Sequence, residues 1–576
     1  MQKRESGQLS QEGDTLGRMR IAVVADGEGG GWLQELDEAP GPIRRVGDLA
    51  AAVREAEQAH PQPPRWVWSA GEDVYPDLVR AGVRVSRCHD AALTEALLLG
   101  YHARHGEASS LGAAWARLHQ LPVPDDPVRP LGEVGTAHSQ PALFEADRST
   151  LPPGTDRLAA LVEVHADQLR RLAELPDPAP GRMRLLAAVE SAGGLAAAEM
   201  SHHGLPWRPD VHDEILTGLL GPRPPSGQRP PVLADLVARI GEAVGREVNP
   251  DSPAQVLRAM AWIGHPVDST RSWVLEKVDH PVVPLLLRYK ELARLHSANG
   301  WTWLDTWVRR RPGPDGTALG RFHPDYVVGG VVSGRWATRG GGALQIPRSL
   351  RGAVRADPGW VLVRADAGQL EPRVLAAVSG DDALAAAAAE EDLYARLAVH
   401  VGGDRDRAKI GMLSAMYGQT SGDAAPLLAT MRRLYPRALE YVDSAARTGE
   451  GGGIVRSWLG RTSPAPEAWS SAVSGPGGER RRRAQGRFTR NFVVQATAAE
   501  WALVLLASLR QRLPDMPEGA GIVFFVHDEV VLHVPADLAG EAVRAVAEAE
   551  ATTRATLFGD TPVRFPLAPV VTRNIG

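Results

Sequence analysis

Short, mainly apolar runs recur within the first ninety positions of the chain. Three of them have the length and composition of β-strands, at residues 20–26, 65–69 and 83–86. Helix-like patterns follow at 93–102 and 111–121. Strands that alternate with helices predict an α/β domain, which we expect to end in the Pro-rich stretch 122–153.

From residue 156 the spacing of apolar residues becomes mainly helical. The helical patterns run over 156–220, 233–244 and 282–295. Strand-like segments then appear at 326–332 and 360–364, helix-rich stretches at 370–434 and 487–513, and a strand–turn–strand unit at 522–534. A chain of 576 residues is expected to form about two to four domains, so this order predicts a multidomain α/β protein.

Composition narrows the setting of the protein without deciding its function. The net charge of −5 argues neither for nor against nucleic acid, because total charge does not report a local basic cleft. The single cysteine, Cys88, fits a reducing cytoplasm. No apolar run reaches the roughly 18 residues that span a bilayer, and the polar N-terminus lacks the apolar core of a signal peptide. We therefore expect a cytoplasmic protein without a membrane anchor, with residues 1–18 a disordered leader or a mis-assigned start.

Lysine and asparagine are rare in this chain, and this makes the few that occur informative. Lysine occurs only at positions 3, 277, 290 and 409, and asparagine only at 249, 299, 491 and 574. Arginine can replace lysine wherever only a positive charge is needed. A lysine such as Lys409 is therefore a candidate for a role that depends on its specific chemistry.

The segment VLVRADAGQLEPRVLA (361–376) predicts a strand that ends in Asp366 and a helix that starts near Gln369. A carboxylate at a strand end, followed by an abrupt turn, is well placed to hold a hard cation. The alternative is that Asp366 only caps the following helix, which is common for aspartate.

A second carboxylate lies in GIVFFVHDEVVLHVP (521–535), where two apolar strands flank His527, Asp528 and Glu529. Polar residues at a hairpin tip are usually only a turn. However, His527 and Glu529 are larger than turns favour, and the flanking strands have the composition of buried strands. Two carboxylates from distant segments, each on a strand, are what a two-metal phosphoryl-transfer site requires.

A basic helix face forms the third candidate, in RDRAKIGMLSAMYG (405–418). Arg405, Lys409, Leu413 and Tyr417 are spaced four apart and so share one side of a helix. Such a face can grip a triphosphate and stack an aromatic ring on a base. The alternative is a solvated basic face, which the presence of a rare lysine at this position disfavours.

Taken together, the three segments resemble motifs A, B and C of the family A DNA polymerases, the DNA polymerase I family. Other segments also resemble the family: SGR (333–335) followed by LQIP (344–347), IVRSWLGR (454–461), Arg487-x3-Asn491-x3-Gln495, NPDSPAQV (249–256) and LLLRYKELARL (285–295). The resemblance covers residue 155 to the C-terminus. Leu413 departs from the family pattern, which has Phe or Tyr there, and Ala367-Gly368 replaces a more typical Tyr-Ser.

The resemblance implies template-directed DNA synthesis, in which dNTPs are added to a primer 3′-OH with two Mg²⁺ ions. Asp366 and Asp528 would bind both ions, and Lys409 and Glu529 would complete the catalytic set, with Lys409 a candidate proton donor to pyrophosphate. The implied dNTP-binding residues are Arg405, Lys409, Leu413, Tyr417, Gln369, Glu371 and His527. The implied primer–template contacts are Arg335, Arg373, Arg487, Asn491 and Gln495. Glu371 would exclude ribonucleotides and accept a hydrogen bond from Tyr417.

The resemblance also implies a right-hand polymerase, of class α/β multidomain, behind a ribonuclease H-like exonuclease-type domain. The expected parts are an exonuclease-like domain at 19–150, a helical thumb at 155–315, a palm at 316–380 and 500–576, and fingers at 381–499. We expect a monomer that binds primer–template DNA and dNTPs, no membrane, and a cytoplasmic location associated with the nucleoid. The length leaves no room for a 5′-nuclease domain, as in bacterial bifunctional exonuclease/polymerases that lack one.

The exonuclease-like domain has lost its expected catalytic pattern. Residues 68–100 resemble the family's middle exonuclease segment, with Asp90 near a structural aspartate. Asp26 and Glu28 spell Asp-x-Glu, but they fall at a strand end beside glycines. No tyrosine lies between Tyr101 and Tyr289 to complete the later Tyr-x3-Asp. We therefore expect no proofreading.

Four alternatives remain open. The first is an active bifunctional polymerase and exonuclease, and the second is a catalytically dead DNA-binding protein. The third is an exonuclease with a vestigial polymerase, which the changes in the N-terminal domain disfavour. The fourth is a single-subunit RNA polymerase, which Glu371 and the His-Asp-Glu sequence disfavour.

Overall fold

The computed structural model describes residues 19–37, 40–59, 61–128, 149–313, 318–418, 424–467, 469–475, 477–513, 516–517 and 519–576. The predicted leader, residues 1–18, lies outside them. The chain divides into two compact units. Unit 1 comprises Met1–His203, Asp325–Arg339 and Val363–Val571, and unit 2 comprises Gly204–Pro324, Gly340–Leu362 and Thr572–Gly576. Each is described by itself below.

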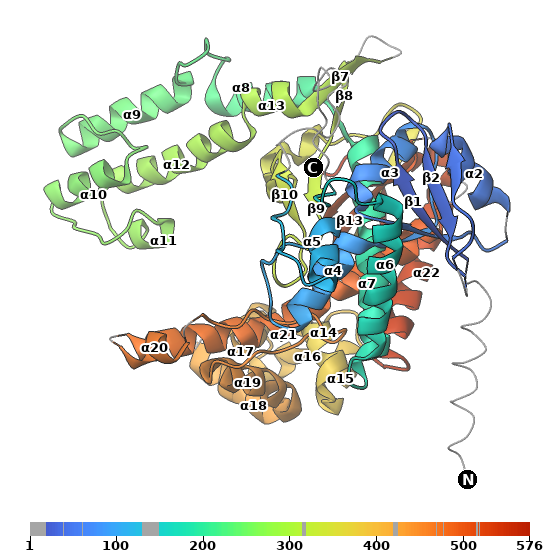
Figure 1. The fold of residues 1–576 in the computed structure, drawn as a ribbon. Helices are drawn as coiled ribbons and strands as arrows, with labels where there is room; N and C mark the ends of the chain where they lie inside the picture. The colour runs from blue at the N-terminus through green and yellow to red at the C-terminus, as the bar shows by residue number, and fades with distance from the viewer. Residues whose placement is uncertain are drawn as a thin grey trace. The chain divides into compact units, whose positions relative to one another are not determined.

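Unit 1 begins with a five-stranded mixed sheet in the order β3-β2-β1-β4-β5. The strands are β1 (Arg20–Ala25), β2 (Gly31–Glu35), β3 (Arg44–Val46), β4 (Arg65–Trp68) and β5 (Arg87–Asp90). The strand β1 runs antiparallel to β2 and parallel to β4, which in turn is parallel to β5. Helices α2 (Leu49–Ala59) and α3 (Gly71–Arg80) connect these strands (Figure 1). The α/β character of this part was therefore predicted correctly, and residues 129–148 of the Pro-rich stretch expected to end it lie outside the described residues.

The predicted strand at 83–86 is misplaced by four residues. The structure pairs β4 with 87–90 instead, from Arg65 opposite Arg87 to Trp68 opposite Asp90. Because β4 is only four residues long, this pairing uses all of its residues. Val83 and Val85 are buried in the core beside the sheet, which explains their strand-like pattern, but they are not part of a strand.

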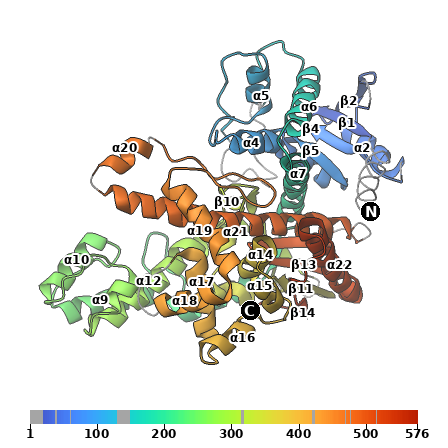
Figure 2. The same ribbon diagram turned by 90° about the horizontal axis from the view of Figure 1, so that it is seen from below.

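Four helices pack with the N-terminal sheet or with one another: α4 (Ala91–Tyr101), α5 (Leu111–Leu118), α6 (Arg157–Ala173) and α7 (Ala179–His203) (Figure 2). Leu158, Leu161 and Val164 of α6 share a core with Val24 and Val67 of the sheet. The helices α6 and α7 therefore belong with the N-terminal part of unit 1, whereas we expected residue 155 to open the thumb. Their helical spacing was correct, but spacing alone does not say against which element a helix buries its apolar face.

A buried ionic cluster fastens this N-terminal part to the long helix α21 (Gly478–Gln511). Arg510 of α21 donates to Glu199 of α7 at 2.5 and 3.0 Å, and to the Tyr75 hydroxyl of α3 at 3.0 Å. It also donates to the carbonyls of Val85 and Ser86. Arg510 is 2% exposed, so its bonds to Glu199, Tyr75 and Val85 are shielded from water.

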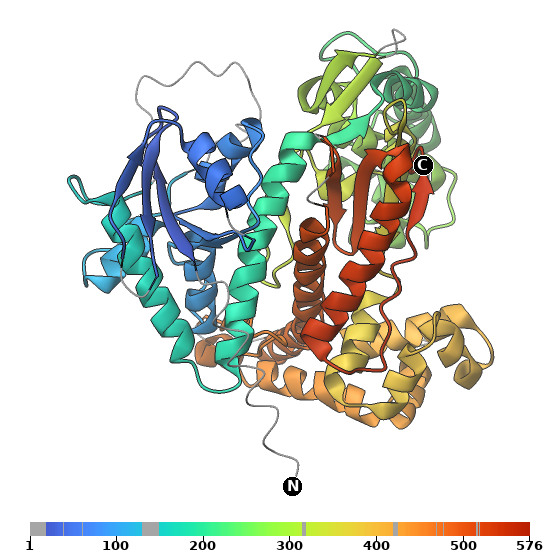
Figure 3. The same cartoon turned by 90° about the vertical axis from the view of Figure 1, so that its right-hand side faces the viewer.

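The second sheet of the chain has the order β12-β13-β11-β14. Its strands are β11 (Trp360–Asp366), β12 (Gly521–Val526), β13 (Glu529–Pro535) and β14 (Val570–Thr572). The hairpin β12–β13 confirms the predicted strand–turn–strand unit. Helix α22 (Ala539–Phe558) packs on β13 and along α21 (Figure 3). By contrast, the strand predicted at 326–332 shrinks to β9 (Asp325–Val327), because the chain turns at Val328 and Gly329.

Between β11 and α21 lies a helical region. It contains α14 (Leu370–Ser379), α15 (Asp382–Ala388), α16 (Leu393–Ala398), α17 (Arg405–Tyr417), α18 (Ala424–Leu434), α19 (Pro436–Glu450) and α20 (Trp469–Ser474). Among the described residues, α21 is the one helix long and apolar enough to cross a bilayer. However, 89% of its apolar stretch is buried inside the protein, as is common for the central helix of a soluble fold.

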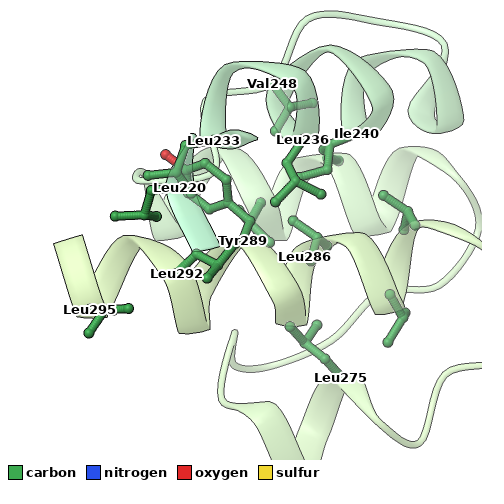
Figure 4. Close-up of a cluster of buried hydrophobic side chains, with 14 of the residues drawn as sticks. Leu220, Leu233, Leu236, Ile240, Val248, Leu275, Leu286, Tyr289, Leu292 and Leu295 are labelled. Atoms are coloured by element: carbon green, nitrogen blue, oxygen red, sulfur yellow. The ribbon is translucent and has the colours of Figure 1, made fainter. Parts of the chain in front are cut away.

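Unit 2 is mainly helical. Its helices are α8 (Pro209–Leu220), α9 (Pro231–Val244), α10 (Pro253–Trp262), α11 (Ser272–Leu275), α12 (Val282–Asn299) and α13 (Trp301–Trp307). Leu233, Leu236 and Ile240 of α9 face Leu286 and Tyr289 of α12 across one apolar core (Figure 4). A small sheet in the order β6-β8-β7 completes the unit, with β6 (Leu205–Trp207), β7 (Val308–Pro312) and β8 (Ala318–Phe322).

Candidate active site

Asp366 and Asp528 lie at the same end of two neighbouring strands. Asp366 is the last residue of β11, and Asp528 stands in the turn that joins β12 to β13, the strand beside β11. The backbone N–H of Ala367 donates to the carbonyl of Asp528 at 3.0 Å, which ties the two segments together. Asp366 does not cap α14, because that helix begins four residues later, at Leu370. The N-cap alternative for Asp366 is therefore wrong.

The electrostatics of this pair suit a bound cation. Burial, and after it the charge of Asp366, raises the pKa of the Asp528 carboxyl to about 6. A divalent cation would favour the charged form of both carboxylates. No group of three or more His, Cys, Asp or Glu side chains that could hold a metal occurs in the part of the chain that the structure describes. Two carboxylates nevertheless fit Mg²⁺, which is commonly held by one or two carboxylates together with water and substrate phosphates.

Two residues beside the aspartates have left-handed backbone conformations without being glycine. His527 has φ +57°, and Gln369 has φ +61°. Such conformations are uncommon for these residue types and concentrate at functional sites. The side chain of Gln369 is held on both sides, since it donates to Asp392 at 2.7 Å and accepts from the N–H of Leu393 at 2.9 Å. The turn after Asp366 is therefore fixed by its surroundings.

Glu371, in the first turn of α14, is the centre of a hydrogen-bonded group. It accepts hydrogen bonds from the Tyr417 hydroxyl and from the guanidinium of Arg335. The bond to Tyr417 was expected from the sequence, whereas the bond to Arg335 was not. Burial raises the pKa of Tyr417, and Glu371 raises it further, so the hydroxyl stays protonated and keeps donating.

The same group walls a pocket that reaches Asp528. Its lining includes Gly334, Arg335, Trp336, Gln369, Leu370, Glu371, Pro372, Tyr417, Ala498, Ala499, Ala502, Leu503, Phe525, His527 and Asp528. The polar residues come from the predicted site, and the apolar residues come largely from α21 and β12. The pocket thus joins a carboxylate expected to bind metal to the residues expected to recognise the sugar.

Helix α17 carries the predicted basic face. Asp404 caps its N-terminus by accepting from the N–H groups of Asp406 and Arg407. Arg405 is exposed and pairs with Asp392 at 2.7 Å, and the side chain of Lys409 is exposed one turn later. Leu413 and Tyr417 follow and are half-buried. This helix face therefore begins with the exposed side chains of Arg405 and Lys409 and ends with Tyr417, which lines the pocket.

Helix α21 adds a second, more open pocket. Arg487, Asn491 and Gln495, spaced four apart, line it together with Tyr417, Ala484 and Phe488. The side-chain oxygen of Asn491 is buried and has no hydrogen-bond partner among the described residues. An unsatisfied acceptor of this kind is expected where a ligand supplies the missing donor.

Comparison with known proteins decides the family. A sequence profile of DNA polymerase family A matches residues 230–565, more than half of the chain. The chain belongs to DNA polymerase family A.

Individual relatives agree with this assignment. The thermostable DNA polymerase I of Thermus filiformis is 30% identical over 296 residues, which are 47% of this chain and 34% of that protein. DNA polymerase I of Chloroflexus aurantiacus is 26% identical over 379 residues, 58% of this chain and 39% of that protein. The chain thus spans little more than a third of the length of these relatives.

A solved structure extends the comparison to nearly the whole chain. It is the POL domain of Pol1 from M. smegmatis in complex with DNA primer-template and dNTP. At 20% identity it covers 99% of this chain and 97% of that domain, with a TM-score of 0.70. This likeness shows that the family A chain has the fold of a DNA polymerase I polymerase domain. Family A polymerases use divalent metal ions.

Two predicted site residues of this family A chain are buried and bonded within the protein. Arg373 is fully buried, and its guanidinium donates to the carbonyls of Gly368, Ala388, Glu390, Glu391 and Arg564. The prediction that it contacts primer–template DNA is therefore wrong. Because it holds Gly368 and the segment before α16, it fixes the turn that follows Asp366.

Glu529 is the second of these residues. It is 5% exposed and pairs with Arg364. Glu529 therefore faces a neighbouring strand, in contrast to its predicted place among the catalytic groups. Sequence reasoning missed Arg364 altogether, although its position two residues before Asp366, on the same face of β11, was a signal.

Asp26, the first residue of the Asp-x-Glu pair in the N-terminal part, has a structural role. Asp26 accepts hydrogen bonds from the N–H groups of Glu28 and Gly30 at 2.9 Å each, which closes the turn between β1 and β2. Glu28 itself is exposed. Asp90 caps α4 and accepts from the N–H of Gly71 at 2.6 Å, and burial raises its pKa to about 7.

Proposed function

We propose that the protein is a DNA-directed DNA polymerase that transfers deoxynucleotides from dNTPs to a primer 3′-OH and releases pyrophosphate. The observation that carries this proposal is the pair Asp366 and Asp528 at the ends of adjacent strands, next to the pocket that contains Glu371 and Tyr417. In this reading, unit 2 supplies the thumb, the β12-β13-β11-β14 sheet is the palm, and α15 to α19 are the fingers.

The two aspartates would hold two Mg²⁺ ions. These ions, when bound, activate the primer hydroxyl and neutralise charge on the triphosphate. Arg405 and Lys409 would bind the triphosphate oxygens, because they project into solvent from one face of α17. Lys409 would also donate a proton to the leaving pyrophosphate. Leu413, Tyr417, Gln369 and His527 would surround the base and sugar.

Primer–template binding would use Arg335 and the α21 face of Arg487, Asn491 and Gln495. Minor-groove acceptors occupy similar positions in every Watson–Crick pair, so donors of this kind check pair geometry without reading sequence. We expect the protein to act as a monomer in the cytoplasm, on the DNA of the nucleoid.

Glu371 gives a prediction about sugar selection. Replacing Glu371 by alanine removes the group that fills the space beside the sugar C2′ and leaves Arg335 and Tyr417 without their shared acceptor. Incorporation of ribonucleotides relative to deoxynucleotides should rise roughly 100-fold. The ratio of kcat/KM for rATP and dATP measures this. Glu541→Ala, an exposed change in α22, should leave the ratio unaltered, and an unaltered ratio in Glu371→Ala would remove Glu371 from sugar selection.

The N-terminal part is expected to be inactive as an exonuclease. Asp26 is engaged in closing a turn, and Glu28 points to solvent beside glycines. An end-labelled primer–template incubated with the protein and Mg²⁺ but no dNTPs should keep its length. Shortening that persists in Asp366→Asn would show an active proofreading site and favour the bifunctional alternative.

The decisive test of the proposal is primer extension in the presence of dNTPs. Extension to the end of the template, absent in Asp366→Asn, is the expected result. Tight primer–template binding with no extension by the wild-type protein would instead favour a DNA-binding protein built on a polymerase fold. The presence of both aspartates and both α17 cations argues against that alternative.

A further inference from the structure

An arginine stands beside Asp366, one of the two carboxylates of the site, and has no role in the function proposed above. Arg364 lies on β11, two residues before Asp366, so both side chains project from the same face of the strand. Its Nε donates to Glu529 Oε1 on the neighbouring strand β13 at 2.5 Å. Its Nη2 lies 3.7 Å from Asp366 Oδ2. One guanidinium thus bridges Asp366 and Glu529.

The two halves of this bridge are unequal. Glu529 is buried and receives a short, direct hydrogen bond, whereas Asp366 is half-exposed and lies at ion-pair distance only. A buried carboxylate without a partner is costly, so the bond to Glu529 is the firmer of the two. Arg364 is therefore anchored by Glu529 and presents the rest of its positive charge to Asp366.

This arrangement has a consequence for metal binding. A cation held by Asp366 must approach an oxygen that already has a positive neighbour, and like charges a few ångströms apart weaken each other's binding. The hydrogen bond to Glu529 opposes this effect, because it draws the guanidinium toward β13 and partly neutralises it. Arg364 and Glu529 thus act on Asp366 in opposite directions.

We propose that Arg364 is a positioning residue that sets the metal affinity of the site, with Glu529 as the counter-charge that restrains it. This inference rests on the proposed function, since it concerns the ions that Asp366 and Asp528 would hold. It assigns Glu529 an indirect role in place of metal or substrate contact. It also accounts for an arginine with two acidic neighbours at the floor of a site that must bind cations.

The test is a titration of the whole 576-residue chain with Mn²⁺ alone, in which electron paramagnetic resonance reports the free ion. Arg364→Gln should bind Mn²⁺ about three- to tenfold more tightly than wild type, a range set by the partial exposure of both partners. Glu529→Gln should bind it more weakly by a similar factor. The double variant, which leaves no buried charge unpaired, should fall between the two and keeps the test valid if a single variant fails to fold.

Opposite shifts distinguish this role from a merely structural one. Loss of packing or of strand order would weaken binding in both single variants. Weakening in both, or no change beyond that of the control Arg544→Gln on α22, would overturn the inference. The inference alone would fail if Asp366→Asn lost Mn²⁺ binding while Arg364→Gln matched wild type. No Mn²⁺ binding by the wild-type protein would instead contradict the metal site, and with it the proposed function.

Discussion

Replacing Asp528 by asparagine is expected to lower the rate of primer extension by at least about a thousandfold. The amide has the shape of the carboxylate but no charge, so it holds a divalent cation much more weakly than the carboxylate does. The turn should survive, because the bond that joins it to β11 uses the backbone carbonyl of Asp528 and the N–H of Ala367. Single-turnover extension of an end-labelled primer measures the effect.

A control variant that loses an aspartate charge away from the site shows whether the position of the lost charge matters. Asp537→Asn removes an exposed aspartate a few residues further along the chain and should extend primers at the wild-type rate. Both variants should bind duplex primer–template within about twofold of wild type, as followed by fluorescence anisotropy, because neither aspartate is expected to touch the phosphate backbone. Extension that survives in Asp528→Asn would refute the assignment of Asp528 to the metal site.

The second large effect concerns stability. Replacing Arg510 by leucine should destabilise the protein by about 3–5 kcal/mol, because it leaves the buried carboxylate of Glu199 without its main partner. Thermal unfolding should begin at a clearly lower temperature, as measured by calorimetry. Arg482→Leu, an exposed change on the same helix, should leave the unfolding temperature nearly unaltered. A melting curve for Arg510→Leu that matches this control would contradict the role of the ionic cluster.

The pH dependence of this effect follows from Glu199. Burial alone would raise its pKa, but Arg510 and Arg84 outweigh burial and lower the pKa from 4.5 to about 2. A depressed pKa means that the ionised group stabilises the fold above about pH 4.5, and that this contribution is lost as the pH falls toward 2. The difference in unfolding free energy between wild type and Arg510→Leu should therefore be constant near neutral pH and shrink below pH 4.5.

The sequence correctly placed those site residues whose position depends only on a single helix or hairpin. Arg405 and Tyr417 lie on one helix, and Asp528 lies between two strongly apolar strands. The spacing of apolar residues along the chain is therefore enough to place them. The bond between Glu371 and Tyr417 joins segments 46 positions apart, and here the family resemblance supplied what local spacing could not.

The predictions for Arg373 and Glu529 were wrong because the fold buries both side chains. Both residues have the amino-acid type and the motif position expected of site residues. However, the fold surrounds Arg373 with five carbonyl groups and places Glu529 against Arg364. Neither surrounding can be read from neighbours in sequence. The helices α6 and α7 were predicted correctly as helices, because the spacing of apolar residues reveals a helical period. The same spacing does not reveal which surface covers the apolar face, so their packing against the N-terminal part was not predicted.

The attachment of α21 to the N-terminal part gives that part a structural role that does not depend on nuclease chemistry. The first half of α21 carries Arg487 and Asn491, and Arg510 near its C-terminus bonds to residues of α3 and α7. Deleting the N-terminal part would remove Glu199 and Tyr75, and the buried Arg510 would then lose the partners that anchor the helix. Shortening this chain to a minimal enzyme would therefore have to keep the N-terminal part or rebuild the surface that it covers.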